Sequence, residues 1–395
     1  MTSFNGPPER KTRGTGAPSR AGMLPTGVDG RQLPAGTISR SVQVDLRSPW
    51  AIRDVEIPTR LVLAPMAGVS VQAFRRQGRR YGAGLVCSEM VSCAGLHHGN
   101  ERTLGYLRIS ADERPLAVQI FGSEPEVMAE AARMVEDAGA DLVDVNFGCP
   151  VKKVTKTGAG ATLLEDPERA CRVISAVAEA VSVPVTVKMR RGLQNGSRSC
   201  LELGPRLVEA GASSLTLHPR SAKQMYTGEA DHSLTAELAA LVDVPVIASG
   251  DVTSRARAQA ILATTGAAAV MVGRAAQGNP WALREILDGY TEEPTREEVV
   301  AELILFMRET VRELGEQRST GFLKKFYGWY LGRGRFPRPF KQELVMLPTI
   351  AEVEARLFAA APGARFVLER LLREVPDPAD EVLLDSLPIS IYGGG

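Results

Sequence analysis

The sequence has little that is typical of a secreted, disulfide-linked or membrane-spanning protein. Its five cysteines are odd in number and include no Cys-x-x-Cys pair, which argues against a disulfide framework or a zinc knuckle. No run stays apolar over the length of a membrane span, and the N-terminus lacks the apolar core of a secretory signal. We therefore expect a cytoplasmic protein that has neither a metal site nor a membrane segment.

An excess of charge is also missing. The 47 lysines and arginines are balanced by 46 aspartates and glutamates, which leaves a formal charge of +1. No global positive field therefore indicates a nucleic-acid partner, and any site for one must be a local basic patch. The length of 395 residues fits one barrel of the usual size together with a smaller appendage.

The two ends of the chain lack the apolar residues that a packed core needs. Residues 1–45 are rich in Gly, Pro, Arg and Ser without sustained periodicity, and residues 376–395 are acidic and finish in Gly. Such segments cannot bury enough surface to offset the entropy of ordering, so we predict a disordered N-terminal tail and a flexible C-terminal tail. A basic tail can touch RNA phosphates, but composition alone favours an unstructured segment without that role.

Between the tails, a repeating pattern predicts strands that alternate with helices. From Leu61, short runs rich in Val, Ile and Leu are each followed by a turn and a segment with helical spacing. Eight such runs, apolar on both faces, predict an α/β fold in which a parallel sheet closes into a (β/α)8 TIM barrel. The predicted strands are Leu61–Pro65, Gly84–Glu89, Leu116–Phe121, Leu142–Phe147, Val183–Met189, Ser214–His218, Val244–Ser249 and Ala269–Gly273.

After Thr295 the strand pattern stops and only helical spacing continues. We therefore assign residues 46–294 to a barrel domain and residues 295–375 to a small all-α domain. The predicted helices of this second domain are Glu297–Leu314, Gly321–Leu331, Pro339–Leu347, Thr349–Ala359 and a segment near Ala364–Arg373.

Polar or conformationally special residues follow nearly every predicted strand. In a parallel barrel the carboxyl ends of the strands meet at one mouth, where function resides. A single Lys or Gln at such a place is more often a solvated or locally bonded group, but here almost all strands contribute. These residues are Pro65, Met66, Glu89, Gln119, Asn146, Cys149, Lys188, Arg190, His218, Arg220, Gly250, Asp251, Gly273 and Arg274.

Two of the loops after strands carry the signature of an anion site. Residues 249–251 and Gly273-Arg274 follow the seventh and eighth strands, where barrels commonly bind a phosphate on backbone N–H groups. Lys188 ends another strand and should seek an anionic partner. A flavin edge that becomes negative on reduction and a barrel carboxylate both meet that need.

The segment around Cys149 places a thiol beside several lysines. Cys149 follows the fourth predicted strand and precedes a Lys-rich and Gly-rich loop, residues 151–160. Cations favour a thiolate, and the same thiol can donate a proton if a carbanion forms nearby. Gln119 can hold a flavin pyrimidine edge and His218 its phosphate or the substrate, although both are equally suited to hydrogen bonding in the core.

Taken together, these stretches resemble the bacterial tRNA-dihydrouridine synthases, nearest the B-type branch. The segment around Cys149 carries most weight, and the similarity extends from Leu61 to Leu357. Ser249 and His232 depart from the family pattern, which has Asn and Trp there. The matching stretches are Ala64–Val69, Gly84–Met90, Val118–Gly122, Asp144–Val154, Val187–Arg190, Leu217–Arg220, Val272–Arg274 and Phe326–Leu331.

The resemblance implies an FMN-dependent oxidoreductase that uses NADPH to reduce a uridine of tRNA to 5,6-dihydrouridine. In that mechanism hydride passes from flavin N5 to uracil C6, and Cys149, as the catalytic acid, protonates C5. The implied FMN-binding residues are Pro65, Met66, Ala67, Gln119, Lys188, His218, Ser249, Gly250, Asp251, Gly273 and Arg274. The implied contacts to uridine or RNA are Asn146, Lys152, Arg190, Arg220, Lys324 and Lys325.

The second domain independently indicates RNA binding. Between Gln317 and Gln342 every charged residue is basic, and seven aromatic residues are interleaved with them. Cations can follow phosphates while aromatics pack or stack. A helix with an aromatic core stripe and a solvated basic face explains the aromatics but leaves the lack of acids unexplained. The basic residues are Arg318, Lys324, Lys325, Arg333, Arg335, Arg338 and Lys341.

Two other functions remain open. One is an FMN-dependent reductase or dehydrogenase of a free pyrimidine, which needs no basic appendage. The other is a non-catalytic RNA-binding barrel protein, which requires neither Cys149 nor a flavin. We expect a monomer, and the sequence does not indicate which uridine would be reduced.

Overall fold

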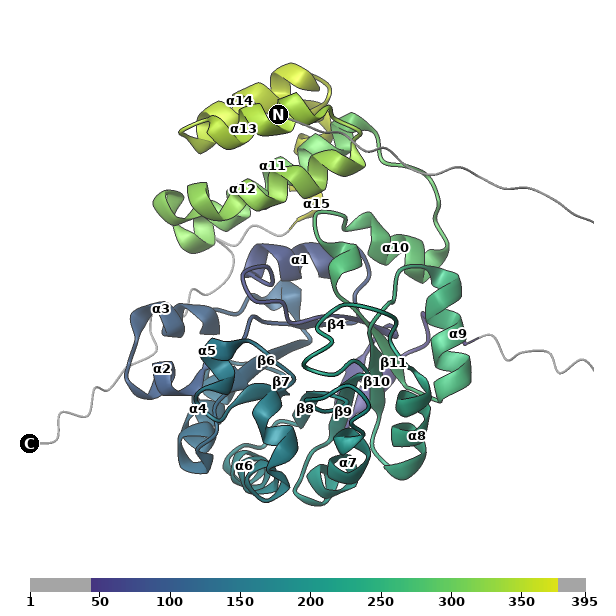
Figure 1. The fold of residues 1–395 in the computed structure, drawn as a ribbon. Coiled ribbons are helices and arrows are strands. Elements are labelled where there is room, and N and C mark those ends of the chain that lie inside the picture. Colours follow the sequence, from purple (N-terminus) through teal and green to yellow (C-terminus); the bar gives the residue numbers. More distant parts are fainter. Residues whose placement is uncertain (1–43, 376–395) are drawn as a thin grey trace, which may run out of the picture. The chain divides into compact units, whose positions relative to one another are not determined.

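The computed structural model describes residues 44–375, which belong to one compact unit (Figure 1). The predicted tails therefore lie almost entirely outside the described residues. None of the helices within residues 44–375 combines the length and the apolar character needed to span a membrane.

A closed parallel barrel forms the main body of this unit. Its sheet has nine strands, of which the short β5 (Val91–Ser92) pairs only with β6. The other eight pair side by side, and a β4–β6 pairing closes the ring, so the predicted (β/α)8 barrel is confirmed. These strands are β3 (Leu61–Leu63), β4 (Leu85–Cys87), β6 (Leu116–Phe121), β7 (Leu142–Phe147), β8 (Val185–Arg190), β9 (Ser214–His218), β10 (Val246–Ser249) and β11 (Ala269–Val272).

Helices between the strands surround the barrel (Figure 1). In α6 the Asp166 carboxylate accepts from Arg169 N at 3.1 Å and Pro167 occupies the first turn, because Asp and Pro favour a helix start. The barrel helices are α1 (Gln72–Arg80), α4 (Pro125–Asp137), α6 (Pro167–Ala180), α7 (Ser199–Glu209), α8 (Ser233–Leu241), α9 (Arg255–Thr265) and α10 (Trp281–Asp288), with the short α2 (Cys93–His97), α3 (Glu101–Leu104) and α5 (Lys152–Thr155).

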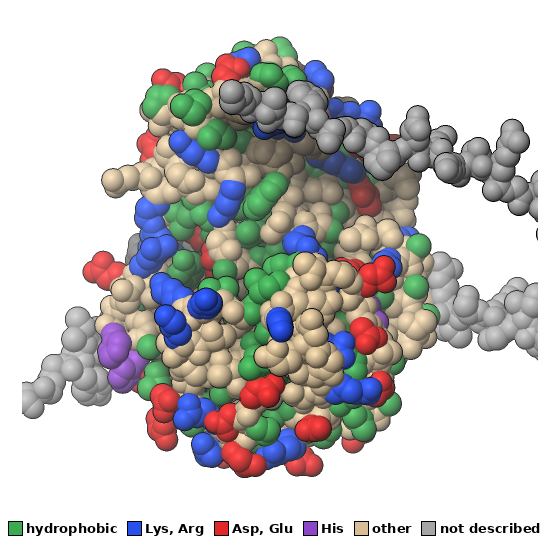
Figure 2. All heavy atoms as spheres, viewed as in Figure 1, with side chains coloured by type: hydrophobic (Ala, Val, Ile, Leu, Met, Phe, Trp, Pro, Cys, Tyr) green, Lys and Arg blue, Asp and Glu red, His purple; other side chains and the backbone are tan. Residues whose placement is uncertain are grey.

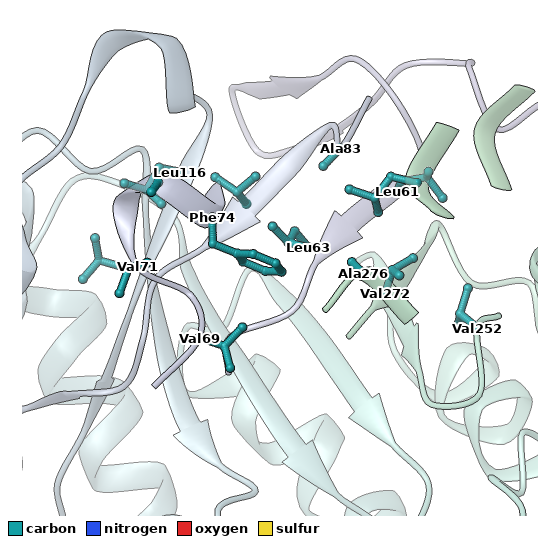
Figure 3. Packing of buried hydrophobic residues seen from close by; sticks show 14 of the residues in the cluster. Leu61, Leu63, Val69, Val71, Phe74, Ala83, Leu116, Val252, Val272 and Ala276 are labelled. Carbon is teal, nitrogen blue, oxygen red and sulfur yellow. The ribbon is translucent and has the colours of Figure 1, made fainter. Parts of the chain in front are cut away.

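Alternation along each strand divides the apolar residues into two cores. Leu61 and Leu63 of β3 face outward, and Figure 3 shows Phe74 of α1 packed toward Leu63. Val62, between them, faces the barrel interior and packs in a separate cluster with Leu85 of β4. Full burial of such a side chain contributes about 1.5–3 kcal/mol to folding stability. Strands that are apolar on both faces therefore stabilise both the core under the helices and the core inside the barrel.

An antiparallel hairpin precedes the barrel, and the sequence pattern did not predict it. The hairpin pairs β1 (Trp50–Ile52) with β2 (Val55–Ile57). Ile52 and Ile57 are fully buried in the interior cluster of the barrel. Strands of three residues are too short to show a period of two, which is why the pattern missed them.

The helical region consists of α11–α15, and all five predicted helices are present. Thr295 and Glu298 form a capping box that starts α11. Because the described residues form one compact unit, the division into two domains at residue 295 stays a prediction. The helices are α11 (Arg296–Leu314), α12 (Glu316–Arg333), α13 (Arg338–Met346), α14 (Ile350–Ala360) and α15 (Ala364–Glu374).

A polar seam joins the helical region to α1 of the barrel. We use "the seam" for Gln77, Arg80 and Tyr81 of the barrel together with Glu302 and Tyr330. The Glu302 carboxylate accepts from Arg80 at 2.9 and 3.0 Å, from Gln77 Nε2 at 2.9 Å and from Tyr81 at 2.9 Å. Tyr330 of α12 donates to Gln77. The helical region is therefore attached through the C-terminal half of α1.

Candidate active site

A cavity of about 360 Å³ opens at the carboxyl ends of β3, β8, β9, β10 and β11. The barrel closure brings most of the predicted cofactor residues to its wall, although they lie far apart in the sequence. Ala67 and Gln119 do not line the cavity. Those that do are Pro65, Met66, Lys188, His218, Ser249, Gly250, Asp251, Gly273 and Arg274.

Lys188 is the central cation of this cavity. Its register neighbours are Asn146 of β7 and Thr216 of β9. Among residues 44–375 no hydrogen bond or ion pair reaches the Lys188 ammonium, so the carboxylate partner that the sequence left open is not observed. Burial and the positive charge of Arg190 lower the pKa of Lys188, Asp144 opposes both effects, and the net pKa is about 8. The charge is therefore available to an anionic ligand.

His218 faces the same cavity as a neutral ring. Burial, together with the positive charges of Lys188 and Arg190, lowers its pKa to about 2. The ring therefore carries no charge near pH 7 and can donate or accept a hydrogen bond. Gly250 has φ +114°, and a Cβ there would lie 3.0 Å from His218 Cδ2. A glycine is thus required for the backbone to pass so close to this histidine.

Arg220 organises the loop beside His218 and does not point a free guanidinium into the cavity. Its Nη2 donates to both oxygens of Asp251 at 2.8 Å and to Gly228 O at 2.5 Å. Burial alone would raise the pKa of Asp251, but the N–H of Ala230 and the Arg220 side chain bring it below its usual range. Asp251 is therefore ionised near pH 7, and in this structure it binds Arg220.

Arg274 and Tyr226 form the rim of the cavity. The Arg274 guanidinium lies 4.6 Å from the centre of the Tyr226 ring and 4.0 Å from Asp251 Oδ1. The Arg274 side chain is 54% exposed, which leaves its cation accessible to a phosphate. The sequence reasoning did not single out Tyr226. The only signal was an aromatic residue in the loop after β9.

Cys149 lies on another side of the mouth, after β7. Asn146 Oδ1 accepts from the backbone N–H of Gly148 at 3.1 Å and of Cys149 at 2.9 Å. The Cys149 side chain is 9% exposed and packs with Val154 and Ala159, so it is less open than the sequence suggested. Asn146, which accepts from the Cys149 N–H, is the register neighbour of Lys188, which places the cysteine and the cationic cavity at one mouth.

The Cys149 segment is held from two further sides. Arg190 donates from Nε to Gly148 O at 3.0 Å and from Nη1 to Ser221 O at 2.9 Å. Gly160 has φ +66°, and a Cβ there would lie 2.7 Å from Cys149 O, so only glycine allows this loop to cover the cysteine. The arginine predicted to contact substrate is therefore buried and braces the cysteine in this structure.

The predicted lysine contacts fall on two regions. Lys152 is exposed on α5, next to Cys149. Lys324 and Lys325 lie on α12. Lys325 donates to Gly68 O and lies 4.0 Å from the centre of the Phe322 ring. Gly68 N in turn donates to Glu89, two residues after the end of β4. Lys325 therefore connects the helical region to the loop after β3, and its role toward RNA stays a prediction.

Gln119 is completely buried and bonds to two neighbouring side chains. Its Nε2 donates to Asp144 Oδ2 at 2.6 Å, and its Oε1 accepts from Asn146 Nδ2 at 2.7 Å. The sequence reasoning missed Asp144. The available signal was its position two residues before Asn146, which places both on the inward face of β7.

Comparisons with known proteins decide the family. The family described as "Dihydrouridine synthase (Dus)" matches residues 62–361. The chain belongs to this family. A relative named tRNA-dihydrouridine synthase B from Pseudomonas aeruginosa is 39% identical over 294 residues, which cover 73% of this chain and 88% of the relative. Another of that name, from Proteus vulgaris, is 40% identical and covers 69% of this chain and 85% of its own.

A solved structure supports the fold of this dihydrouridine synthase family member. Histamine dehydrogenase from Rhizobium sp. 4-9 aligns with a TM-score of 0.52 at 13% identity, over 68% of this chain and 51% of that one. The resemblance inferred from the sequence is thus confirmed at the level of the family and the barrel.

The structure also accommodates two departures from the family pattern. Ser249 lines the cavity, where its hydroxyl can still donate to a phosphate. His232 contacts Gly250 O through Nε2 at 2.9 Å. Burial lowers the pKa of His232, so a neutral imidazole holds the glycine that faces His218.

Proposed function

We propose that this chain is a tRNA-dihydrouridine synthase, which uses NADPH and a bound FMN to reduce the C5–C6 double bond of a uridine in tRNA. Support comes from family membership, from relatives that carry this name at 39–40% identity, and from the site itself. The observation that carries the proposal is the convergence on one barrel mouth of Cys149 and of Lys188, which has no hydrogen-bond or ion-pair partner among residues 44–375. The monomeric state and the cytoplasmic location stay predictions.

The residues of the cavity fit a flavin mononucleotide. An anionic phosphate suits the end that Gly250, Gly273 and Arg274 line, since the glycine backbone permits close approach and the guanidinium supplies charge. At the other end Lys188, which no described side chain pairs, suits a ring edge that becomes negative on reduction. Both ends therefore supply the charges that such a cofactor requires.

Bound FMN, once reduced by NADPH, would supply the hydride for uracil C6. Lys188 would stabilise negative charge at the cofactor's pyrimidine edge, and the preorganised cation costs no rearrangement during the reaction. Asn146 would orient the uracil, and the Cys149 thiol would donate its proton to uracil C5. Gly160 and the segment around it would keep water from the thiol, since they already cover Cys149.

A local basic surface supports RNA as the substrate. Figure 2 shows Lys and Arg side chains at the left and in the middle of the view, with acidic side chains more frequent toward its lower part. On α12 the basic run is thinner than the sequence suggests, because Arg333 pairs with Glu285 and Lys325 bonds to Gly68. Phosphate contacts would therefore come from a few remaining cations, with Lys152 and Lys324 among them.

The aromatic residues of α12 support RNA binding less than the sequence suggested. Phe326, Tyr327 and Tyr330 are buried, so they pack as a core stripe and do not stack on bases. Trp329 is 36% exposed. The RNA contacts proposed for the helical region therefore rest on charge.

The test is to supply the purified, FMN-loaded protein with NADPH and, separately, unmodified tRNA, free uridine or uracil. Dihydrouridine is measured by mass spectrometry of the digested RNA and of the free compounds. We expect dihydrouridine in tRNA and none from the free pyrimidines. Product from the free compounds alone would favour a free-pyrimidine reductase, and RNA binding by a protein that takes up no FMN would favour a non-catalytic protein.

A further inference from the structure

A buried chain of hydrogen bonds links β6 and β7 to the backbone of Cys149. We use "the amide chain" for Asp144, Gln119 and Asn146. Gln119 Nε2 donates to Asp144 Oδ2 at 2.6 Å, and Asn146 Nδ2 donates to Gln119 Oε1 at 2.7 Å. Asn146 Oδ1 then accepts from the N–H of Cys149 at 2.9 Å. Each side chain of the amide chain thus depends on the orientation of the next.

The groups at the two ends of the amide chain determine which way the side-chain amides of Asn146 and Gln119 are turned. Backbone N–H groups can only donate, so Asn146 must present its oxygen to Cys149 and its NH2 to Gln119. Gln119 then presents its oxygen to Asn146, and its own NH2 is left facing Asp144. Only an acceptor at that position completes the arrangement. Asp144 provides one, and Thr186 Oγ1 donates to its other oxygen at 2.6 Å.

Burial makes the direction strict. Gln119 is 0%, Asp144 4% and Asn146 7% exposed, so solvent cannot replace a missing partner freely. A reversed amide in this setting would place two donors or two acceptors face to face. Met90 Sδ, 3.2 Å from Asn146 Nδ2, is the other contact of that amide, and it can accept only weakly.

We propose that Asp144 is a positioning residue: as the terminal acceptor of the amide chain, it fixes Gln119 and Asn146 and thereby holds the backbone of Cys149 in place. The role of the thiol as an acid rests on the proposed function, whereas the hydrogen-bond arrangement does not. Gln119 keeps one N–H and one lone pair that the amide chain does not use, and Asp144 thus also decides which of them faces the mouth.

The test compares Asp144→Ala with Asp144→Asn and measures alkylation of Cys149 by iodoacetamide. Peptide mapping separates Cys149 from the other cysteines, and the protein is used without NADPH or RNA. In Asp144→Asn the new amide oxygen can face Gln119 while its nitrogen donates to Thr186, so we expect a rate within about twofold of the unsubstituted protein. Asp144→Ala removes the acceptor, and loosening of the cysteine backbone should raise the rate about fivefold or more.

Thr186→Val is the matched control. It removes a donor to Asp144 without interrupting the amide chain, so Cys149 alkylation should stay within about twofold. Gln119→Leu interrupts the amide chain at its centre and should accelerate alkylation as Asp144→Ala does. This second variant keeps the test decisive if Asp144→Ala does not fold, as circular dichroism would show.

An unchanged alkylation rate in folded Asp144→Ala or Gln119→Leu would overturn the proposal. Equal acceleration in Asp144→Asn and Asp144→Ala would also overturn it, because the loss of charge, and not of the acceptor, would then be the cause. These outcomes are independent of whether dihydrouridine forms. A protein that makes no dihydrouridine but shows the expected alkylation pattern would refute the proposed function alone.

Discussion

The seam and the barrel mouth both bury charged groups, but only the seam pairs its positive charge with a carboxylate of the protein. At the seam, Glu302 is 2% exposed and receives hydrogen bonds from Arg80, Gln77 and Tyr81. At the mouth, Lys188 has no protein partner among the described residues, and Arg190 donates its hydrogen bonds to carbonyl oxygens. The seam pairs its positive charge with Glu302, although Arg80 Nε finds no hydrogen-bond partner among the described residues, whereas the mouth leaves positive charge unpaired.

This difference separates a structural site from a binding site. A buried charge without a counter-charge costs free energy, so it persists where a ligand supplies the missing charge. The pKa values agree with this contrast. Despite burial, the pKa of Arg80 rises because of Glu302, whereas burial and Arg190 lower the pKa of Lys188.

The largest expected effect is at the seam. Glu302→Ala leaves Arg80 and its neighbours buried without their acceptor, so the free energy of unfolding should fall by about 3–5 kcal/mol. Urea denaturation measures this, while turnover per folded molecule should be preserved. Glu343→Ala, which removes an exposed ion pair with Arg356, is the control and should leave stability almost unchanged. If Glu302→Ala and Glu343→Ala lowered the free energy of unfolding equally, Glu302 would not be the buried counter-charge that the seam requires.

The next effect is at the mouth. Lys188→Met removes the charge that faces the cavity, so we expect turnover to fall about 100-fold or more, as for the loss of one preorganised electrostatic group. Flavin binding, followed by fluorescence, should weaken as well, while the unfolding free energy should not decrease. Lys188→Arg tests whether a cation alone restores binding. Unaltered flavin affinity and turnover in Lys188→Met would argue against the assignment.

A smaller effect concerns Glu309, the incompletely paired carboxylate near the seam. Neither of its oxygens has a hydrogen-bond partner among the described residues, and Arg76 lies 3.6 Å from Oε1. Burial raises the pKa of Glu309 from 4.5 to about 7. The folded state therefore binds more protons than the unfolded state between these pH values, so stability falls as the pH rises through this window.

The pH dependence of Glu309→Gln isolates this contribution. Between pH 5 and pH 8 the unfolding free energy of the unsubstituted protein should fall by about 2 kcal/mol relative to Glu309→Gln, which has no group to titrate there. Denaturant unfolding at several pH values gives both curves. Parallel curves would show that Glu309 has an ordinary pKa.

The smallest effect is expected at the rim. Arg274 is 54% exposed, so its attraction for a phosphate is screened by water, and Arg274→Ala should weaken FMN binding by about five- to tenfold. Titration at low and high salt measures this, and the difference from the unsubstituted protein should shrink at high salt. If Arg274→Ala weakened FMN binding as much as Lys188→Met does, an exposed cation at the rim and a buried cation at the centre would contribute equally, which would contradict the comparison.

Local patterns predicted the elements well, because each depends on a short stretch of sequence. The strands Leu116–Phe121 and Leu142–Phe147 were predicted with the observed bounds, and barrel closure then brought their ends to one mouth. Contacts between distant residues were not predictable in this way. Nothing near Lys325 in the sequence indicates Gly68, 257 residues away, and the seam likewise depends on how α11 and α12 pack against α1.

In the candidate site, too, the position of a residue could be predicted from the sequence, whereas its distant partners could not. Lys188, His218 and Arg274 could be predicted to line the cavity, because strand ends in a parallel barrel converge. The partners of Arg190 and Arg220 could not, because a guanidinium near a mouth can face solvent, substrate or carbonyl oxygens, and only the folded loops decide. Asp144 was overlooked for a related reason: an acid inside an apolar run has no visible partner until Gln119 and Thr186 are placed beside it.

The most direct test of the central claim uses Cys149→Ala loaded with FMN and follows two steps under anaerobic conditions. The claim is that the cationic cavity serves the cofactor and that the thiol serves the uridine. NADPH oxidation by the variant should therefore proceed at the rate of the unsubstituted protein, while mass spectrometry should find almost no dihydrouridine in the tRNA. Full dihydrouridine formation by Cys149→Ala would contradict the account.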